Sequence, residues 1–230
     1  MFSGYLSQSI LSRAIKNNLL SVNIHDIRDF TSDKHHITDE SSYGGGPGMV
    51  LKPEPIVEAV KHINSNSKII ITTPRGKKLD QQMAKELSKE DHIIIICGRY
   101  EGIDERVKEI LNADEISIGD YILTGGELPA MVLVDSISRH IPGVVKESQS
   151  VEEESFSSGL LDWPHYTKPE IFEDIPVPPV LLSGNHGEIN RWRRKKSIEK
   201  TLLCRPDLLN SINPSKEDMA FIEEIINEKI

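Results

Sequence analysis

Glycine is concentrated in two loops that each follow a predicted strand and precede a predicted helix. Gly119, Gly125 and Gly126 lie in one loop, within residues 115–143, and residues 97–102 form the other. Glycine lets a backbone approach a ligand closely or adopt positive φ. Two such loops at neighbouring strand ends are typical of a ligand crevice in an α/β sheet. We therefore expect a pocket walled by main-chain N–H and C=O groups, although an ordinary strand–loop–helix connection has the same composition.

A third glycine cluster, Tyr-Gly-Gly-Gly-Pro-Gly-Met at residues 43–49, has a different character. No Gly-Lys-Ser/Thr follows it, which excludes a Walker-type phosphate loop. The dinucleotide fingerprint also fails, because Met49 stands where the third glycine is required. We expect a rigid, close-packed loop that lines a cleft.

The charge of the chain is unevenly distributed. The net charge is −9, which argues against a protein that coats nucleic acid indiscriminately, yet residues 184–206 contain seven Lys/Arg against two Glu, or 7 − 2 = +5. Such a run is usually a solvated helix face. Trp192 interrupts it, and this favours phosphate contact with local stacking.

Cysteine usage and hydropathy point to a cytoplasmic protein with no membrane association. The two cysteines, Cys97 and Cys204, lack CxxC spacing and stand among apolar residues, so we expect buried free thiols in a reducing compartment. No apolar run approaches the roughly 20 residues of a membrane span, and no signal peptide is recognisable. His35 and His36 have no further ligands at suitable spacing, so no metal site is expected.

The elements that must position these loops follow from hydrophobic periodicity. Continuous β-branched runs at 68–72 and 92–97 predict central parallel strands. Helical patterns follow Pro53 and Pro55, span 78–88 and 103–111, and start at Glu127, where Leu128, Met131, Val132 and Ser136 share a face. This alternation predicts an α/β fold. Its strand-end loops, 73–76, 98–102 and 119–126, should converge on one crevice.

The two ends of the chain are predicted to differ from this centre. We expect a helix at 3–18, a short strand at 22–25, and a mobile loop at 31–42. Residues 144–158 are rich in acid and serine, which is typical of a flexible linker. A basic helix at 188–203 follows. Ser215 and Asp218 resemble a capping box that opens a last helix, which should bury Met219, Ile222, Ile225 and Ile226. The predicted domains are therefore residues 1–145 and 159–230, joined by a linker at 146–158.

Several long motifs, in the same order over nearly the whole chain, resemble the bacterial tRNA (guanine-N1)-methyltransferases. They are YGGGPGM at 43–49, CGRYEGIDERV at 97–107, SIGDY at 117–121, GGELPA at 125–130, SRHIPG at 138–143, GLLD at 159–162 and PHY at 164–166. This combination is far more specific than any one of its members.

The resemblance implies a SPOUT-type parallel sheet with a deep trefoil knot, a smaller helical C-terminal domain, and a homodimer. It also implies methyl transfer from S-adenosyl-L-methionine to N1 of the guanosine 3′ of the anticodon (position 37) in tRNA. Matching positions would bind the cofactor: Ile71, Thr72, Pro74, Gly98, Tyr100, Ile118, Gly119, Asp120, Tyr121, Ile122, Leu123, Gly125 and Gly126.

The chemistry requires a base and an electrostatic partner. Guanine N1 loses its proton as the methyl group arrives, so a carboxylate should accept it, while negative charge develops toward O6. Arg139 matches the family arginine with that second task; a helix-end salt bridge is its structural alternative. The family commonly has Asp before Ser-Phe, where this chain has Glu154. We expect Glu154 to be the base, with Asp162 next, and then Glu101 or Asp120.

Because N1 lies on the Watson–Crick edge, the target base must be unpaired, as in an anticodon loop. Arg191 and Arg194 are expected to contact tRNA phosphates, and Tyr43, Gly45, Gly46 and Glu101 to line the guanine side. The long linker would let the second domain close over the other subunit, which predicts composite active sites.

One departure and two alternatives accompany this hypothesis. The family usually begins with a strand and an aromatic-proline turn before the residues that match Met1 and Phe2, so we expect either that one strand of the sheet is missing or that the given start is late. A knotted methyltransferase that acts on rRNA is the first alternative. A non-catalytic RNA-binding dimer is the second. A Rossmann-type methyltransferase is disfavoured, because no acidic G-x-G turn follows an early strand.

Overall fold

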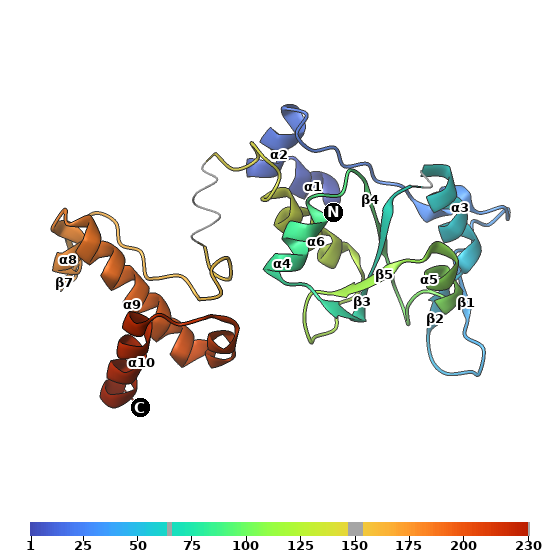
Figure 1. The fold of residues 1–230 in the computed structure, drawn as a ribbon. Helices are drawn as coiled ribbons and strands as arrows, with labels where there is room; N and C mark the ends of the chain where they lie inside the picture. The colour runs from blue at the N-terminus through green and yellow to red at the C-terminus, as the bar shows by residue number, and fades with distance from the viewer. Residues whose placement is uncertain (64–65, 147–153, 230) are drawn as a thin grey trace. The chain divides into compact units, whose positions relative to one another are not determined.

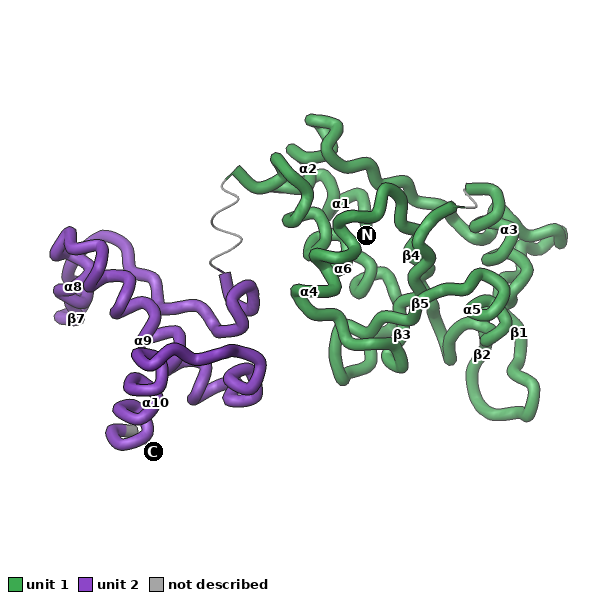
Figure 2. Tube along the Cα trace, in the orientation of Figure 1, with its two compact units in different colours: residues 1–146 green, residues 147–230 purple. Residues whose placement is uncertain are grey.

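The structure is a computed structural model that describes residues 1–63, 66–146 and 154–229 (Figure 1). It divides into two compact units, residues 1–146 and 147–230 (Figure 2). Most of the predicted linker, residues 147–153, lies outside the described residues. The three-part division of the chain therefore stays a prediction.

A three-stranded parallel sheet forms the centre of the first unit. Its strands are β3 (Lys68–Lys78), β4 (Ile93–Cys97) and β5 (Asp114–Ser117), in the order β4-β3-β5. The isoleucine-rich runs pair directly, with Ile71 opposite Ile96. The predicted α/β class with a parallel sheet is confirmed.

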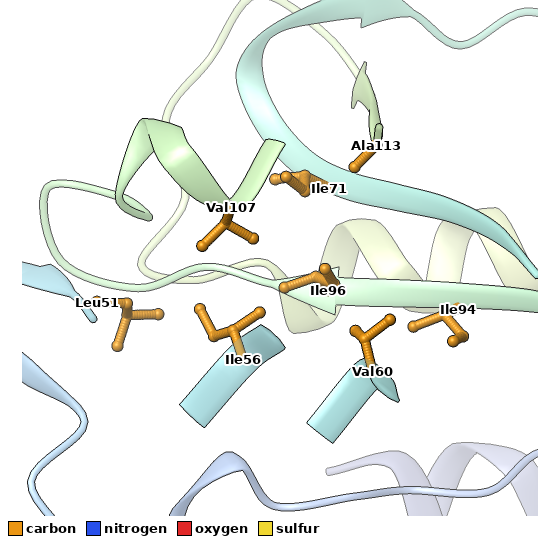
Figure 3. Packing of buried hydrophobic residues seen from close by; sticks show 8 residues of the cluster. All are labelled: Leu51, Ile56, Val60, Ile71, Ile94, Ile96, Val107 and Ala113. Atoms are coloured by element: carbon orange, nitrogen blue, oxygen red, sulfur yellow. The ribbon is translucent and has the colours of Figure 1, made fainter. Parts of the chain in front are cut away.

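Helices cover both faces of this sheet, which explains why its strands are apolar throughout rather than alternating. On one face, Ile71, Ile94 and Ile96 pack against α3 (Pro53–Ile63) and α5 (Glu105–Leu111) (Figure 3). On the other, Ile70 and Ile116 pack against α4 (Gln81–Leu87) and α6 (Glu127–Ser138). Successive isoleucine side chains of β3 point to opposite faces of the sheet, as the two-residue period of a strand requires.

Capping residues mark where these helices begin and end. Asp80 accepts a hydrogen bond from Met83 N at 2.8 Å, and Asp104 accepts one from Arg106 N at 3.0 Å. Each satisfies a backbone donor that a helix start leaves unpaired. Asn112 ends α5 in the left-handed conformation, with φ of 47°. The turn at Asn112 leads the chain from α5 directly into β5.

The N-terminal predictions were wrong in detail. The single helix expected at 3–18 is broken into α1 (Phe2–Leu6) and α2 (Ser9–Lys16), because the backbone is extended at Gln8. Residues 20–26 form no strand in the described chain, since no neighbouring strand there offers a ladder, and a short 3₁₀ helix, η1 (Ile27–Phe30), follows. Part of the expected loop at 31–42 is instead β1 (Asp39–Ser41), which pairs with β2 (Met49–Leu51) in an antiparallel hairpin.

The second unit is mainly helical, as predicted. Its elements are the hairpin of β6 (Ile171–Phe172) and β7 (Ile175–Pro176), α8 (Pro179–Leu182), α9 (His186–Cys204), η2 (Pro206–Ser211) and α10 (Lys216–Lys229). The capping box is confirmed: Asp218 N donates to Ser215 Oγ at 3.1 Å, and Ser215 N donates to Asp218 Oδ2 at 3.0 Å.

The core of this unit differs in part from the predicted one. It contains Leu160, Ile198, Phe221 and Ile225. Met219 and Ile226 are exposed, because the buried face of α10 contains Asp218, Phe221 and Ile225, and Met219 and Ile226 lie outside it. No helix of the described residues is both long enough and apolar enough to cross a membrane.

Candidate active site

A cavity of about 350 Å³ lies at the carboxyl end of the parallel sheet, a size in the range of small-molecule pockets. Its wall is made of residues 71–75, which lie within β3, and of the loops that follow β4 and β5. The loop predicted at 73–76 is thus an irregular stretch inside a longer strand. Twelve of the residues expected to bind a cofactor line it: Ile71, Thr72, Pro74, Gly98, Tyr100, Ile118, Gly119, Tyr121, Ile122, Leu123, Gly125 and Gly126. Asp120 is not among the described lining residues, and its exposed carboxylate lies 3.9 Å from Lys78 Nζ.

Strand β3 and the loop after β5 meet at Thr72 and Gly126. The buried Thr72 hydroxyl lies 3.2 Å from Ile96 O and 3.3 Å from Gly126 O, within reach of both as a donor. A Cβ on Gly126 would lie 2.8 Å from both Cys97 Cα and Gly98 N, as well as against the Thr72 hydroxyl. Only glycine fits here, so main-chain atoms form this wall of the cavity.

The loop after β4 is joined to the start of α6 by an ion pair and by backbone contacts. Arg99 Nε donates to Glu127 Oε1 at 2.8 Å, and Gly126 N donates to Gly98 O at 2.8 Å. Tyr100 adopts positive φ of 57° at the turn. Arg99 and Glu127 were not among the predicted site residues, although an opposite-charge pair flanking the two glycine loops was a signal for them.

The loop after β5 supplies both the floor and the rim of the cavity. Ser117 Oγ accepts from Gly119 N at 3.2 Å, and Gly119 has φ of +153°. A side chain on Gly119 would collide with the ring of Tyr121. Ile122 is 79% exposed at the rim, so apolar surface surrounds the opening.

A charged end of the cavity went unrecognised in the sequence. Arg75, Glu105, Lys108 and Glu115 line it together. They come from three separate elements and have no common motif, so only the fold brings them together.

Cys97 lies beside this cavity, at the end of β4. Burial, with the carboxylate of Glu127 as a second cause, raises the pKa of its thiol to about 12. The side chain is half-buried, so the expectation of a fully buried thiol is not met here. Cys204 is exposed, which corrects the expectation that both thiols are buried.

Arg139 lies at the C-terminal end of α6, where its N–H donates to Asp135 O at 3.3 Å. The described residues that line the cavity do not include it. The Tyr5 hydroxyl donates to the Asp135 carboxylate, and burial together with that carboxylate raises the pKa of Tyr5 to about 12. This bond joins α1 to α6 one turn before Arg139.

The glycine cluster at 43–49 forms the connection of the β1–β2 hairpin. Tyr43 is fully exposed, and Gly45 and Gly46 have open space around them. Gly48 is different, since a Cβ there would lie 2.6 Å from Glu101 Cγ. Glu101 lines the cavity, and the backbone of β2 adjoins the same segment: Glu101 N donates to Met49 O at 3.0 Å, and Asp104 N donates to Leu51 O at 3.0 Å. The expectation of a close-packed loop that lines a cleft is wrong for residues 43–46, which are exposed and open.

The two candidate bases, Glu154 and Asp162, share a turn in the second unit. Asp162 N donates to Ser155 Oγ at 2.9 Å. Both Asp162 oxygens have partners: Trp163 N donates to Oδ1 at 2.7 Å, and His165 Nε2 lies 2.8 Å from Oδ2. The N–H of Asp162 thus joins it to Ser155, next to Glu154, while its carboxylate fixes residues 163–165.

The basic run of α9 is largely paired with acids. Arg194 makes a two-pronged ion pair with the buried Asp218, at 2.8 and 2.9 Å. Arg191 pairs with Glu217 at 2.7 Å, and its side chain is half exposed. The acids lie on α10, which the sequence pattern did not associate with the basic run.

Comparison with known proteins gives a consistent result. The model of the tRNA (guanine-1)-methyltransferase TrmD family matches residues 1–211. A tRNA (guanine-N(1)-)-methyltransferase of Dehalococcoides mccartyi is 51% identical over 233 residues, which cover 100% of this chain and 94% of the relative. One from Dictyoglomus turgidum is 52% identical over 229 residues, covering 99% and 93%. One from Citrifermentans bemidjiense is 52% identical over 228 residues, covering 98% and 92%.

These matches extend over all three segments that wall the cavity and over the turn that carries Glu154. The chain belongs to the tRNA (guanine-N1)-methyltransferase family.

Proposed function

We propose that the protein transfers a methyl group from S-adenosyl-L-methionine to N1 of the guanosine 3′ of the anticodon (position 37) in tRNA. The observation that carries this proposal is the cavity at the sheet edge, walled by three neighbouring segments. Its volume of about 350 Å³ suits a single cofactor of this size. Its glycine-lined wall supports recognition by main-chain groups.

The chain offers the donor set that S-adenosylmethionine needs. Main-chain N–H and C=O groups around Gly98, Gly119 and Gly126 suit the hydrogen-bonding edge of adenine. Apolar side chains such as Ile118 and Leu123 suit its faces. When bound, the cofactor supplies an electrophilic methyl group on a sulfonium centre. In the same proposal, the loops that hold it form a deep trefoil knot.

Two residues of the chain handle the charge that methyl transfer creates on guanine. Glu154 accepts the N1 proton as general base. The Arg139 guanidinium stabilises the negative charge that develops toward O6. Asp162 is the second candidate for the base, and its two hydrogen-bonded oxygens favour a supporting role.

The tRNA is proposed to present its anticodon stem-loop, because N1 becomes accessible only in an unpaired guanine. Arg191 and Arg194 are proposed phosphate contacts; of the two, Arg191 is the more exposed. Tyr43, Gly45, Gly46 and Glu101 are proposed to lie on the guanine side.

A homodimer with composite active sites is part of this proposal. The face of α6 that contains Leu128 and Val132 is exposed, at 47% and 43%, although the helix as a whole is apolar. An exposed apolar helix face of this kind is typical of a subunit interface. We also propose a cytoplasmic location, in keeping with two free cysteines.

Calorimetry and a methylation assay together test the function. The full chain should bind S-adenosylhomocysteine, and it should methylate transcripts with guanosine but not adenosine at the target position. No heat of binding would favour the non-catalytic RNA-binding dimer. Equal methylation of both transcripts, or methylation of rRNA alone, would contradict the proposed substrate.

A further inference from the structure

Strand β3 makes an excursion at the edge of the cavity. Thr72 and Lys77 are both opposite Ile116 on β5, so residues 73–76 leave the ladder between them. Thr73, Pro74 and Arg75 line the cavity. Residues 73–76 lie close against β5, since a Cβ on Gly76 would lie 2.7 Å from Glu115 O.

Arg75 joins this excursion to two other elements. Its Nη2 lies 3.1 Å from Glu105 Oε2 on α5 and 3.5 Å from Glu115 Oε1 on β5. Lys108 Nζ completes the network, at 2.6 Å from Glu115 Oε2 and 3.8 Å from Glu105 Oε1. Two cations and two carboxylates thus balance each other at one end of the cavity.

Exposure differs sharply across the network. The Glu115 side chain is only 17% exposed, whereas that of Arg75 is 69% exposed. A carboxylate held at a pocket wall is costly to leave without a cation. Arg75 and Lys108 therefore hold the Glu115 side chain in place. The Arg75 side chain connects this carboxylate to residues 73–76.

We infer that Arg75 is a positioning residue for the cofactor: it holds residues 73–76 against α5 and β5 so that this wall of the cavity is formed before the cofactor binds. The inference rests on the proposed function, since it takes the cavity to hold S-adenosylmethionine. A preformed wall lowers the conformational cost of binding. Arg75 acts through Glu105 and Glu115, without contact to the reacting atoms.

A double-mutant cycle on the full chain tests this. The dissociation constant for S-adenosylhomocysteine is measured for the wild type, Arg75→Gln, Glu105→Gln and the double variant. Arg75→Gln, which removes both of its ion pairs, should bind about five- to ten-fold more weakly at low salt. Glu105→Gln should lose part of this affinity, and the double variant should bind no more weakly than Arg75→Gln alone. The kcat at saturating cofactor should stay within about two-fold of the wild type, since only binding is affected.

Two measurements sharpen the outcome. The loss of affinity for S-adenosylhomocysteine in Arg75→Gln should shrink at about 1 M salt, where exposed charges are screened. Lys61→Gln is the matched control, because it removes one cation from the exposed Lys61–Glu58 pair on α3, and it should bind like the wild type.

Arg75→Gln binding as tightly as Lys61→Gln would overturn the inference, and so would a further loss on adding Glu105→Gln to Arg75→Gln. The second result would mean that Glu105 acts on the cofactor independently of Arg75. If the wild type itself binds no S-adenosylhomocysteine, the proposed function fails instead.

Discussion

At the scale of single residues, hydrogen bonds fix the position of the Asp162 side chain. Asp162 uses one oxygen to accept from Trp163 N and the other to meet His165. A carboxylate with both oxygens engaged is held in place, which favours a supporting role for Asp162. Glu154, eight residues earlier in the chain, belongs to the same turn and remains the proposed base.

Glu154→Gln should lower kcat by about 10²- to 10⁴-fold, because the amide cannot accept the N1 proton. Cofactor affinity should be unchanged. Asp162→Asn should have a smaller effect, through the position of the turn. Single-turnover methylation measures both, with Glu223→Gln on the exposed side of α10 as a charge-matched control. A larger loss in Asp162→Asn than in Glu154→Gln would reverse the assignment.

The two cysteines should differ in reactivity. The thiolate is the reactive form, and burial raises the pKa of Cys97 to about 12, whereas Cys204 is exposed. A thiol reagent at about pH 8 should therefore modify Cys204 quickly and Cys97 slowly. Cys204→Ser should remove the fast phase of a colorimetric thiol assay. A fast phase that persists in this variant would show that Cys97 is accessible.

At the scale of elements, α9 and α10 are joined by charge as well as by apolar packing. Arg194 and Asp218 form a two-pronged ion pair, and Asp218 also closes the capping box at the start of α10. The hydrogen bond from Arg194 is the main reason that the pKa of Asp218 is lowered to about 2. One carboxylate thus stabilises both the helix start and the helix pair.

Arg194→Met should lower the free energy of unfolding of the second unit by about 2 kcal/mol, because it leaves the buried Asp218 without its cation. Arg191→Met breaks an exposed pair and should cost less than about 1 kcal/mol. Urea denaturation of the full chain near neutral pH measures both. Equal losses of unfolding free energy in the two variants would contradict the distinction between a buried and an exposed ion pair.

The same pair predicts the acid dependence. The pKa of Asp218 is lower in the folded state than its ordinary value of 3.8, so its stabilisation is complete above about pH 4 and is lost as the pH falls toward 2. The difference between the wild type and Arg194→Met should shrink over this interval. A difference that does not change with pH would exclude Asp218 as its source.

At the scale of the whole molecule, three apolar cores and one exposed helix face define the organisation. The sheet and its helices form the cores of the first unit, and α9 and α10 enclose that of the second. Leu128 and Val132 on α6 belong to none of these cores. In a two-fold dimer, the same apolar patch would meet its copy.

Val132→Glu should convert a homodimer to a monomer, because it places a charge in that patch. Light scattering coupled to size exclusion measures the mass. Leu203→Glu is the matched control, since Leu203 is a similarly exposed apolar residue on α9, and it should leave the dimer intact. A dimeric Val132→Glu would place the interface elsewhere.

The residue patterns predicted most of the central architecture. The isoleucine runs of β3 and β4 and the stripes of α3 and α4 are local signals, because strand and helix periods are written in adjacent residues. The stripe predicted for α6 was wrong in part, since Leu128 and Val132 are exposed while Leu133 and Ile137 are buried. The capping box at Ser215 is local in the same way. The break at Gln8 and the missing strand at 22–25 were not predictable, since a strand exists only where another part of the chain offers a ladder.

For the site, the sequence by itself determined the glycine loops and the family motifs, because close backbone approach and motif order are properties of the linear chain. Only the tertiary structure decided which charges meet: Arg75 with Glu105 and Glu115, Arg99 with Glu127, and Arg194 with Asp218. Each of these pairs joins segments at least 24 residues apart. Coulombic attraction depends on distance in space, and that distance is set by the packing of the whole core.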